Sequence, residues 1–192
     1  MIHLIGPGGA GKSTVGPLVA ARLAVPFHDL DRRFAAAAGD IDGFLHAHGY
    51  AAYARRNVEV YEEIVRGGVG GVIAPSSGFM TYAPAVHARY AEIRERIARD
   101  PATVVLLPAL DRERCVAETV RRQLTRGLPG RTPTREAAVI RARYEVHVAL
   151  GAVCVETMRP VHEVADEIIR RLARTAASAA ERIVAADVAG HA

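Results

Sequence analysis

The sequence predicts a three-layer α/β/α fold built around a parallel sheet. Short apolar runs alternate along the chain with longer segments in which apolar residues recur at helical spacing. Strands that are buried on both faces read as continuous apolar runs, and parallel neighbours need helical crossovers between them. We therefore expect helices on both faces of the sheet, joined to it by right-handed crossovers.

Five strands are expected, and helices should fill most of the chain between them. The strands are expected at residues 2–5, 25–29, 71–74, 103–107 and 152–155. Helices are expected from about residue 12 to the stop at Pro26, over 31–66 and 82–99, and from about residues 111, 134 and 160 onward. Between the helices that begin near residues 111 and 134, residues 126–133 carry glycines and prolines and break the helical pattern.

The chain length fits one domain with a well-buried core. We assign residues 1–175 to this single domain and residues 176–192 to an Ala-rich C-terminal tail that is helical by propensity. No apolar run approaches the roughly 18 residues needed to cross a bilayer, and Met1 leads directly into an expected strand. We expect a cytoplasmic protein without a membrane partner, either a monomer or a weak homodimer.

The basic residues are almost all arginine. Of 25 basic residues, Lys12 is the only lysine, which indicates a position where a compact ammonium cannot be exchanged for a guanidinium. The pI is about 9.4, but the net charge is only +4 and arginines alternate with acids, so a small anionic ligand is favoured over nucleic acid. Cys115 and Cys154 are far apart and lack metal-ligand spacing, which predicts reduced thiols rather than a disulfide or a zinc site.

Residues 6–13 match the phosphate-binding pattern G-x(4)-G-K-[S/T] and lie between an expected strand and an expected helix. Such a loop points backbone N–H groups at a phosphate, and the positive end of the helix adds to them. We expect ATP as the nucleotide, with Lys12 as a catalytic residue at the β- and γ-phosphates and Ser13 as a ligand of Mg²⁺. The expected nucleotide-binding residues are Gly8, Gly9, Ala10, Gly11, Lys12, Ser13 and Thr14. A degenerate loop that binds no nucleotide is the alternative.

Two aspartates, Asp29 and Asp31, follow the second expected strand. Their i, i+2 spacing places both on one side of the chain, at the strand end where ligands of parallel sheets bind. Two nearby carboxylates suit a cation and a substrate hydroxyl. We expect Asp29 to hold Mg²⁺ and Asp31 to orient the acceptor hydroxyl and take its proton. The alternative is that Asp31 caps the next helix while Asp29 is solvated.

These features together resemble the shikimate kinases. The loop Gly-Pro-Gly-Gly-Ala-Gly-Lys-Ser-Thr, the helix after it and the Asp29-x-Asp31 pair carry the resemblance, which follows the element order over residues 1–170 and is specific over about the first 35. It implies a P-loop kinase fold with a five-stranded parallel sheet and a mobile arginine-bearing lid over ATP. It also implies that Asp31 contacts the acceptor hydroxyl while Ser13 and Asp29 serve the metal.

The sequence departs from that family on the acceptor side. The Phe-Arg-x-x-Glu element becomes residues 53–57, Tyr-Ala-Arg-Arg-Asn, which displaces the arginine by one position and rotates it by about 100° on a helix. The family's three-glycine turn becomes Pro-Ser-Ser-Gly at residues 75–78. Candidate acceptor-binding residues are Arg55, Ser77 and Gly78; the alternatives are a solvated helix face and an ordinary turn. The expected acceptor is a small hydroxylated molecule, either shikimate or another polyhydroxylated metabolite.

Arginines dominate the segment expected to form the lid, residues 121–134. Arg126 resembles the family's lid arginine and is the candidate that closes over ATP and stabilises the transferring phosphoryl group. Arg122 is a further candidate for nucleotide binding. Arg141 and Arg143 resemble the family's carboxylate-binding arginine in Arg-x-x-x-Tyr, with a shorter spacing to the tyrosine. An exposed basic loop without a ligand is the alternative for the lid.

Two other functions share the same phosphate loop. One is a different P-loop metabolite kinase, of the gluconate type or an antibiotic phosphotransferase. The other is a nucleotide-dependent switch or a nucleic-acid-associated ATPase, which the 5% aromatic content and the absence of a motor-type acidic strand disfavour. The sequence therefore favours a small-molecule kinase with an altered acceptor site and no nucleic-acid partner.

Overall fold

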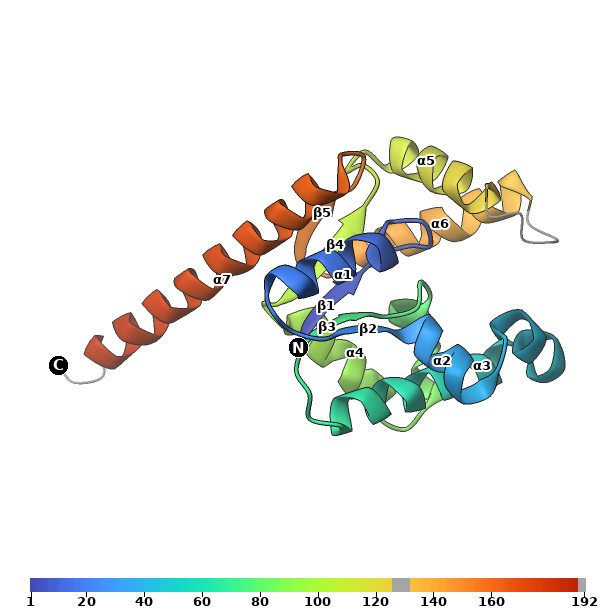
Figure 1. The fold of residues 1–192 in the computed structure, drawn as a ribbon, viewed down its shortest axis with the longest axis horizontal. Coiled ribbons are helices and arrows are strands. Elements are labelled where there is room, and N and C mark those ends of the chain that lie inside the picture. Colours follow the sequence, from blue (N-terminus) through green and yellow to red (C-terminus); the bar gives the residue numbers. More distant parts are fainter. Residues whose placement is uncertain (126–131, 190–192) are drawn as a thin grey trace.

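A computed structural model describes residues 1–125 and 132–189, with no side chains described at 179, 180 and 182–189. Five parallel strands form one sheet in the order β2-β3-β1-β4-β5, as Figure 1 shows. They are β1 (Ile2–Ile5), β2 (Phe27–Asp29), β3 (Val72–Ala74), β4 (Thr103–Leu107) and β5 (Val153–Glu156). The predicted α/β fold with a five-stranded parallel sheet is confirmed. Strand β2 begins later than expected because the N–H of Val25 donates to the carbonyl of Ala20 at the end of the first helix.

Seven α-helices connect and cover the strands of the described chain. They are α1 (Lys12–Arg22), α2 (Leu30–Ala38), α3 (Ile41–Arg66), α4 (Tyr90–Arg99), α5 (Arg112–Leu124), α6 (Pro133–Val148) and α7 (Val161–Ala189). The helices expected through about residues 31–66 are α2 and α3, which Gly39 separates; Asp40 then caps α3 by accepting from the N–H of Gly43 over 2.8 Å. A second break lies inside α3 at Gly49, where φ is 78°.

The helix expected over residues 82–99 is wrong in its first half. Two short 3₁₀ turns, Phe79–Thr81 and Pro84–Val86, precede α4. Proline disfavours helical geometry in the residue before it, and Ala83 is accordingly extended with ψ at 137°. The helical pattern can begin only after this segment, at Tyr90.

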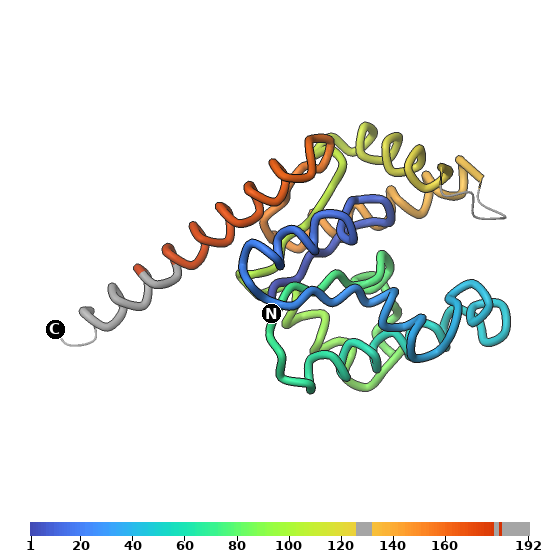
Figure 2. Tube along the Cα trace, in the orientation of Figure 1, coloured from blue at the N-terminus to red at the C-terminus, as the bar shows by residue number. Residues whose placement is uncertain are grey.

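Both faces of the sheet are covered. Val104 and Leu106 of β4 face the side packed by α1 and α7, whereas Val105 and Leu107 face the side packed by α3 and α4. All four side chains are fully buried, as the period-two alternation of a central strand requires. The tube in Figure 2 shows the same three layers, with α1 on one side of the strands and α3 and α4 on the other. This arrangement directs the loops that follow the strands to one edge of the sheet.

The C-terminal helix α7 passes residue 175 without a break, so the division between domain and tail at that residue stays a prediction. Neither Cys115 nor Cys154 is in a disulfide, and burial raises the pKa of both thiols. Across residues 1–125 and 132–189, no helix combines the length and apolarity needed to span a membrane.

Candidate active site

The phosphate loop joins β1 to α1 at the centre of the sheet. It ends at Gly11, whose φ of 97° lies in the left-handed region that favours glycine. Gly11 occupies the N-cap position of α1 and gives that helix no side-chain cap. The first N–H groups of α1 can therefore be satisfied by an anion, as is typical of phosphate sites at helix N-termini.

Lys12 lies at the base of this loop. Its side chain is buried, and Nζ donates to the carbonyl oxygens of Gly6 over 2.7 Å and of Pro7 over 3.1 Å. The ammonium is therefore held against the loop itself, where an incoming polyphosphate would meet it.

A cavity of about 550 Å³, here called the main cavity, opens above the loop. It brings together most of the residues that the sequence singled out: Gly8, Gly9, Gly11, Lys12, Ser13, Thr14, Asp29, Asp31, Ser77, Gly78 and Arg143. Ala10 is different, because it is fully buried and packs in the core on the α1 side of the sheet. The phosphate-loop side chains and the two aspartates thus share one space.

The two aspartates have separate environments. Asp29 is the residue that caps α2, accepting from the N–H of Arg32 over 3.2 Å, so the alternative in which Asp31 caps the helix is wrong. Asp31 lies in the first turn of α2, where its Oδ1 accepts a hydrogen bond from the hydroxyl of Ser76. Only Asp31 is therefore tied to the turn that follows β3.

Two tyrosines and Arg143 are among the residues that line the main cavity opposite the phosphate loop. Tyr50 and Tyr53 both contribute to its wall, with ring centroids 5.9 Å apart. Burial, and then the charge of Asp31, raise the pKa of Tyr53 to about 12, so this phenol stays protonated. Arg143 on α6 donates from Nη1 to the hydroxyl of Ser77 over 3.1 Å. The cavity wall therefore carries two phenols together with Arg143, which contacts the turn after β3, and a second arginine of α6, Arg135.

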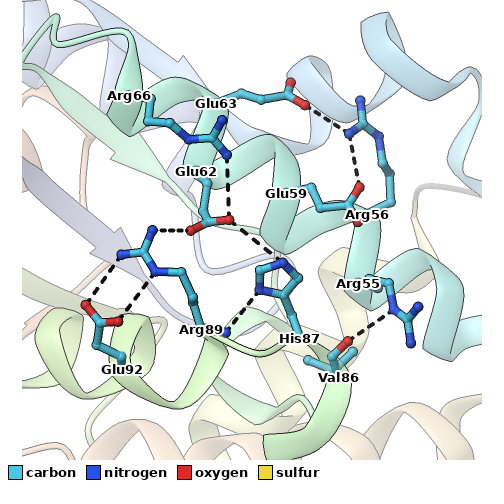
Figure 3. Close-up of polar contacts among 10 residues, drawn as sticks. All are labelled: Arg55, Arg56, Glu59, Glu62, Glu63, Arg66, Val86, His87, Arg89 and Glu92. Carbon is cyan, nitrogen blue, oxygen red and sulfur yellow. Dashed lines mark hydrogen bonds and ion pairs between the residues drawn. The ribbon is translucent and has the colours of Figure 1, made fainter.

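Two predicted acceptor-binding arginines lie outside the main cavity. Arg55 is exposed on α3 and donates from Nε to the carbonyl of Val86, as Figure 3 shows. Arg141 is exposed and forms an ion pair with Glu113 at 2.7 Å. The one-residue displacement read from the sequence explains the first case, because the inward position of α3 is taken by buried Ala54.

Figure 3 also shows a cluster of charged residues around Glu62 on α3. Glu62 is buried and lies within ion-pair distance of Arg66, His87 and Arg89. The contact with Arg89 is the shortest at 2.7 Å. These contacts connect α3 to the segment before α4. The charged residues near Arg55 therefore stabilise the packing of that segment against α3.

A second hollow of about 360 Å³ lies on the other side of the phosphate loop. It is lined by Gly9, Gly11, Thr14, Val15, Arg122, Thr157, Arg159, Val161 and Val164. Arg122 spans it, donating to the carbonyl of Gly9 over 3.0 Å and to the hydroxyl of Thr157 over 3.3 Å. Glu118 forms an ion pair with the same guanidinium at 2.7 Å. The predicted lid arginine, Arg126, lies outside the described residues.

Several cavity residues were missed by the sequence analysis. Gln123 is buried, and its amide lies so close to the loop that a Cβ added at Gly8 would be 1.8 Å from its Nε2. Tyr50 and Tyr53, which line the main cavity, were not predicted either, and neither was Ser76, which contacts Asp31. The i, i+3 spacing of the two tyrosines places them on one helical face. This spacing was the sequence feature that could have indicated a shared position in the cavity wall.

The donor set fits a magnesium ion. Ser13 and Asp29 both line the main cavity and offer oxygen ligands, which Mg²⁺ prefers. Over residues 1–125 and 132–189, no three His, Cys, Asp or Glu side chains gather into a metal site.

Comparison with known proteins identifies the group to which this architecture belongs. The family model for shikimate kinase matches residues 8–173. The chain belongs to the shikimate kinase family. Shikimate kinases are ATP-dependent small-molecule kinases, so the resemblance read from the phosphate loop and the two aspartates is confirmed.

Individual relatives agree with the family. A shikimate kinase of Bradyrhizobium diazoefficiens is 30% identical over 175 residues, which cover 82% of this chain and 79% of the relative. One from Paracidovorax citrulli is 36% identical over 131 residues, which cover 66% of this chain but only 64% of that relative's length.

Solved structures share the fold at low identity. Shikimate kinase from Acinetobacter baumannii, in complex with shikimate, superimposes with a TM-score of 0.71 at 22% identity, over 88% of this chain and 90% of the other. A gluconokinase from Sinorhizobium meliloti gives a lower TM-score of 0.57 at 16% identity, over 94% and 95% of the two chains. The fold is therefore nearer to the shikimate kinase than to the gluconokinase.

Proposed function

We propose that this protein transfers the γ-phosphoryl group of ATP to a hydroxyl of shikimate or of a related small polyhydroxylated molecule. The observation that carries the proposal is that Lys12, Ser13 and Asp31 line one cavity. A phosphate-binding loop alone would serve any nucleotide-binding protein. A carboxylate that faces the loop across the same cavity adds a place for an acceptor hydroxyl.

Residues of both hollows would hold the nucleotide: those from Gly8 to Thr14 would face its triphosphate, and Arg122 and Thr157 would border its adenosine. Ser13 and Asp29 would hold Mg²⁺, which would neutralise charge on the phosphates. Arg126 lies outside the described residues, and its role as the arginine that covers the nucleotide and excludes water stays a prediction from sequence.

In the chemical step, the acceptor oxygen forms a bond to the γ-phosphorus while the bond between that phosphorus and the β,γ-bridging oxygen breaks. ADP leaves with the electron pair, and the hydroxyl proton passes to the carboxylate of Asp31. Lys12 stabilises the negative charge that develops on the departing oxygen. Catalysis is then mostly positioning and electrostatics, as in other phosphoryl transfers.

The acceptor side supports shikimate as the first candidate without restricting the choice to it. Arg143 lines the main cavity and can pair with a carboxylate. Arg55 and Arg141, in contrast, are engaged elsewhere. Arg143, with Arg135 also lining the cavity, suits an acceptor that carries an anionic group, and the phenols of Tyr50 and Tyr53 suit a ring face that packs on them.

Calorimetry and a coupled ADP-release assay test the proposal together. We expect heat on mixing the protein with Mg²⁺ and a non-hydrolysable ATP analogue, and ADP release that requires an acceptor from a panel of shikimate, quinate, gluconate and myo-inositol. Asp31→Asn should bind the analogue normally and lose transfer. ADP release that is independent of every acceptor would favour a nucleotide switch or ATPase, and the absence of nucleotide binding would reject the proposal entirely.

A further inference from the structure

Two neighbouring serines in the turn after β3 contact the two charged groups of the acceptor side. The Ser76 hydroxyl donates to Oδ1 of Asp31, and the Ser77 hydroxyl accepts from Nη1 of Arg143. Ser76 is buried, with 6% of its surface exposed. The turn therefore contacts a carboxylate with one side chain and a guanidinium with the next.

The sheet register explains why Ser76 meets Asp31. Asp29 of β2 pairs with Ala74 of β3, and both strands end at these residues. Asp31 and Ser76 each lie two residues beyond that pair, so they emerge side by side. Pro75 fixes its own φ, and the N–H of Phe79 donates to the carbonyl of Ser76 over 2.9 Å, which closes the turn.

The hydrogen bond from Ser76 occupies one of the two carboxylate oxygens of Asp31. Within the described chain, no hydrogen bond other than that from Ser76 reaches the Asp31 side chain. A carboxylate has two oxygens that accept, so Oδ2 remains available to an acceptor hydroxyl while Oδ1 is held. The fixed oxygen restricts rotation of the carboxylate, which is how a hydrogen-bonded neighbour pre-organises a general base.

We propose that Ser76 is a positioning residue for Asp31 and that Ser77 is a positioning residue for Arg143, so that this turn sets the geometry of both the base and the acceptor's anionic group. The inference rests on the proposed function. It assigns the turn a task that glycines, expected here from the family resemblance, cannot perform because they carry no hydroxyl. The two serines should affect different kinetic constants, since one acts on the chemical step and the other on acceptor binding.

A purely structural role is the competing explanation for Ser76. The hydrogen bond to Asp31 could simply fasten the turn to the start of α2. In that case its loss would lower stability and would be felt whether or not position 31 carries a carboxylate. A positioning role requires that the effect disappear once the carboxylate is gone.

Steady-state kinetics on the full chain separate these explanations. Ser76→Ala should lower kcat by about 10- to 100-fold, the range for losing a hydrogen bond to a charged group, and should leave the KM for ATP within about twofold. Ser76→Thr keeps the hydroxyl and should recover most of kcat. In the Asp31→Asn background, Ser76→Ala should leave the small residual rate of transfer, measured at high enzyme concentration, unchanged. A kcat within twofold of the parent, failure of threonine to rescue, or a further loss in the Asp31→Asn background would each overturn the assignment of Ser76.

Ser77→Ala should raise the KM for the acceptor about tenfold and change kcat little, because it acts through the orientation of Arg143. The reverse pattern, a fall in kcat with an unchanged acceptor KM, would overturn the assignment of Ser77. Thr175→Ala removes a hydroxyl from α7, far along the chain from this turn, and is the matched control that should leave all constants unchanged.

A crystal structure separates failure of this inference from failure of the proposed function. If no acceptor on the panel is phosphorylated, the kinase proposal fails, while the positions of the side chains can still be compared. We expect Ser76 Oγ within hydrogen-bonding distance of Asp31 in the parent and a changed Asp31 rotamer in Ser76→Ala. The same Asp31 rotamer in both structures would overturn the positioning role regardless of activity.

Discussion

Arg122 donates a hydrogen bond from Nη1 to the carbonyl oxygen of Gly9 across 3.0 Å, which connects α5 directly to the phosphate loop. The guanidinium is held in place on its other side by Glu118. Arg121 and Arg122 hold the pKa of Glu118 at about 2, with the hydrogen bond from Arg121 the larger cause. A cation therefore lines the second hollow and contacts the phosphate loop before any ligand arrives.

Removal of this cation should weaken ATP binding selectively. We expect Arg122→Ala to raise the KM for ATP about tenfold, as for the loss of a charged contact to a ligand, and to leave the KM for the acceptor unchanged. Arg121→Ala is the matched control, because Arg121 is 64% exposed and pairs with Glu118 without reaching the loop. Equal effects of the two substitutions on the KM for ATP would show that the contact with Gly9 has no part in nucleotide binding.

The fit between Gln123 and Gly8 predicts a second effect on the nucleotide side. A Cβ added at Gly8 would lie 1.8 Å from Nε2 of Gln123, so Gly8→Ala must push the amide away from the loop. We expect MgATP affinity, measured by calorimetry, to fall by about tenfold, and the double variant Gly8→Ala/Gln123→Ala to recover part of the loss. Gly70→Ala introduces a methyl group into open space and serves as the control. If Gln123→Ala worsens binding in the Gly8→Ala background, steric conflict is not the cause.

Lys12 should be irreplaceable even by arginine. We expect Lys12→Ala to lower kcat by about 100- to 1,000-fold, the range for removal of one group that stabilises transition-state charge. Lys12→Arg should be nearly as inactive, because the buried site accommodates a compact ammonium that donates to two adjacent carbonyls. Circular dichroism would verify that both variants are folded. A loss of less than tenfold in Lys12→Ala would mean that the ammonium does not act on the transferring group.

The arrangement of the phosphate loop was predictable from sequence because the loop is a contiguous segment. The pattern around Lys12 fixes a strand, a loop and a helix within a few residues, so local order alone places Ser13 and Thr14 in the main cavity. Asp29 and Asp31 follow from the rule that strand ends meet at one edge of a parallel sheet. Which of them caps α2 required coordinates, because both positions are compatible with a cap.

The acceptor side was less predictable because it is assembled from distant segments. Arg55 was proposed as a ligand on sequence grounds, although its register on α3 directs it to Val86. The contact between Ser76 and Asp31 depends on the pairing of β2 with β3, which one sequence does not give. The expected helix before residue 90 failed for a local reason, since Pro84 constrains Ala83 in a segment whose apolar spacing otherwise fits a helix.

His147 gives a prediction about stability and pH that is independent of the substrate. Its imidazole is 1% exposed and lies 2.6 Å from the carbonyl of Arg143. Burial lowers the pKa of His147 to about 4, and the charges of Lys12 and Arg143 act in the same direction. In the unfolded chain, histidine titrates near its ordinary pKa of about 6.5. His147 is therefore neutral in the folded protein at pH values where the unfolded chain carries the proton.

The sign of the effect follows from that difference. Between about pH 6.5 and 4, the unfolded state binds one more proton at this residue, so stability falls with decreasing pH by about 1.4 kcal/mol per pH unit. His147→Gln removes that proton, and urea denaturation at several pH values should show a slope shallower than that of the parent by this amount. His162→Gln makes the same exchange at an exposed position and is the control. Because His3 is also buried with its pKa lowered to about 4, part of the pH dependence of stability should persist in His147→Gln. Parallel plots of stability against pH for the variant and the parent would show that the fold does not hold His147 neutral.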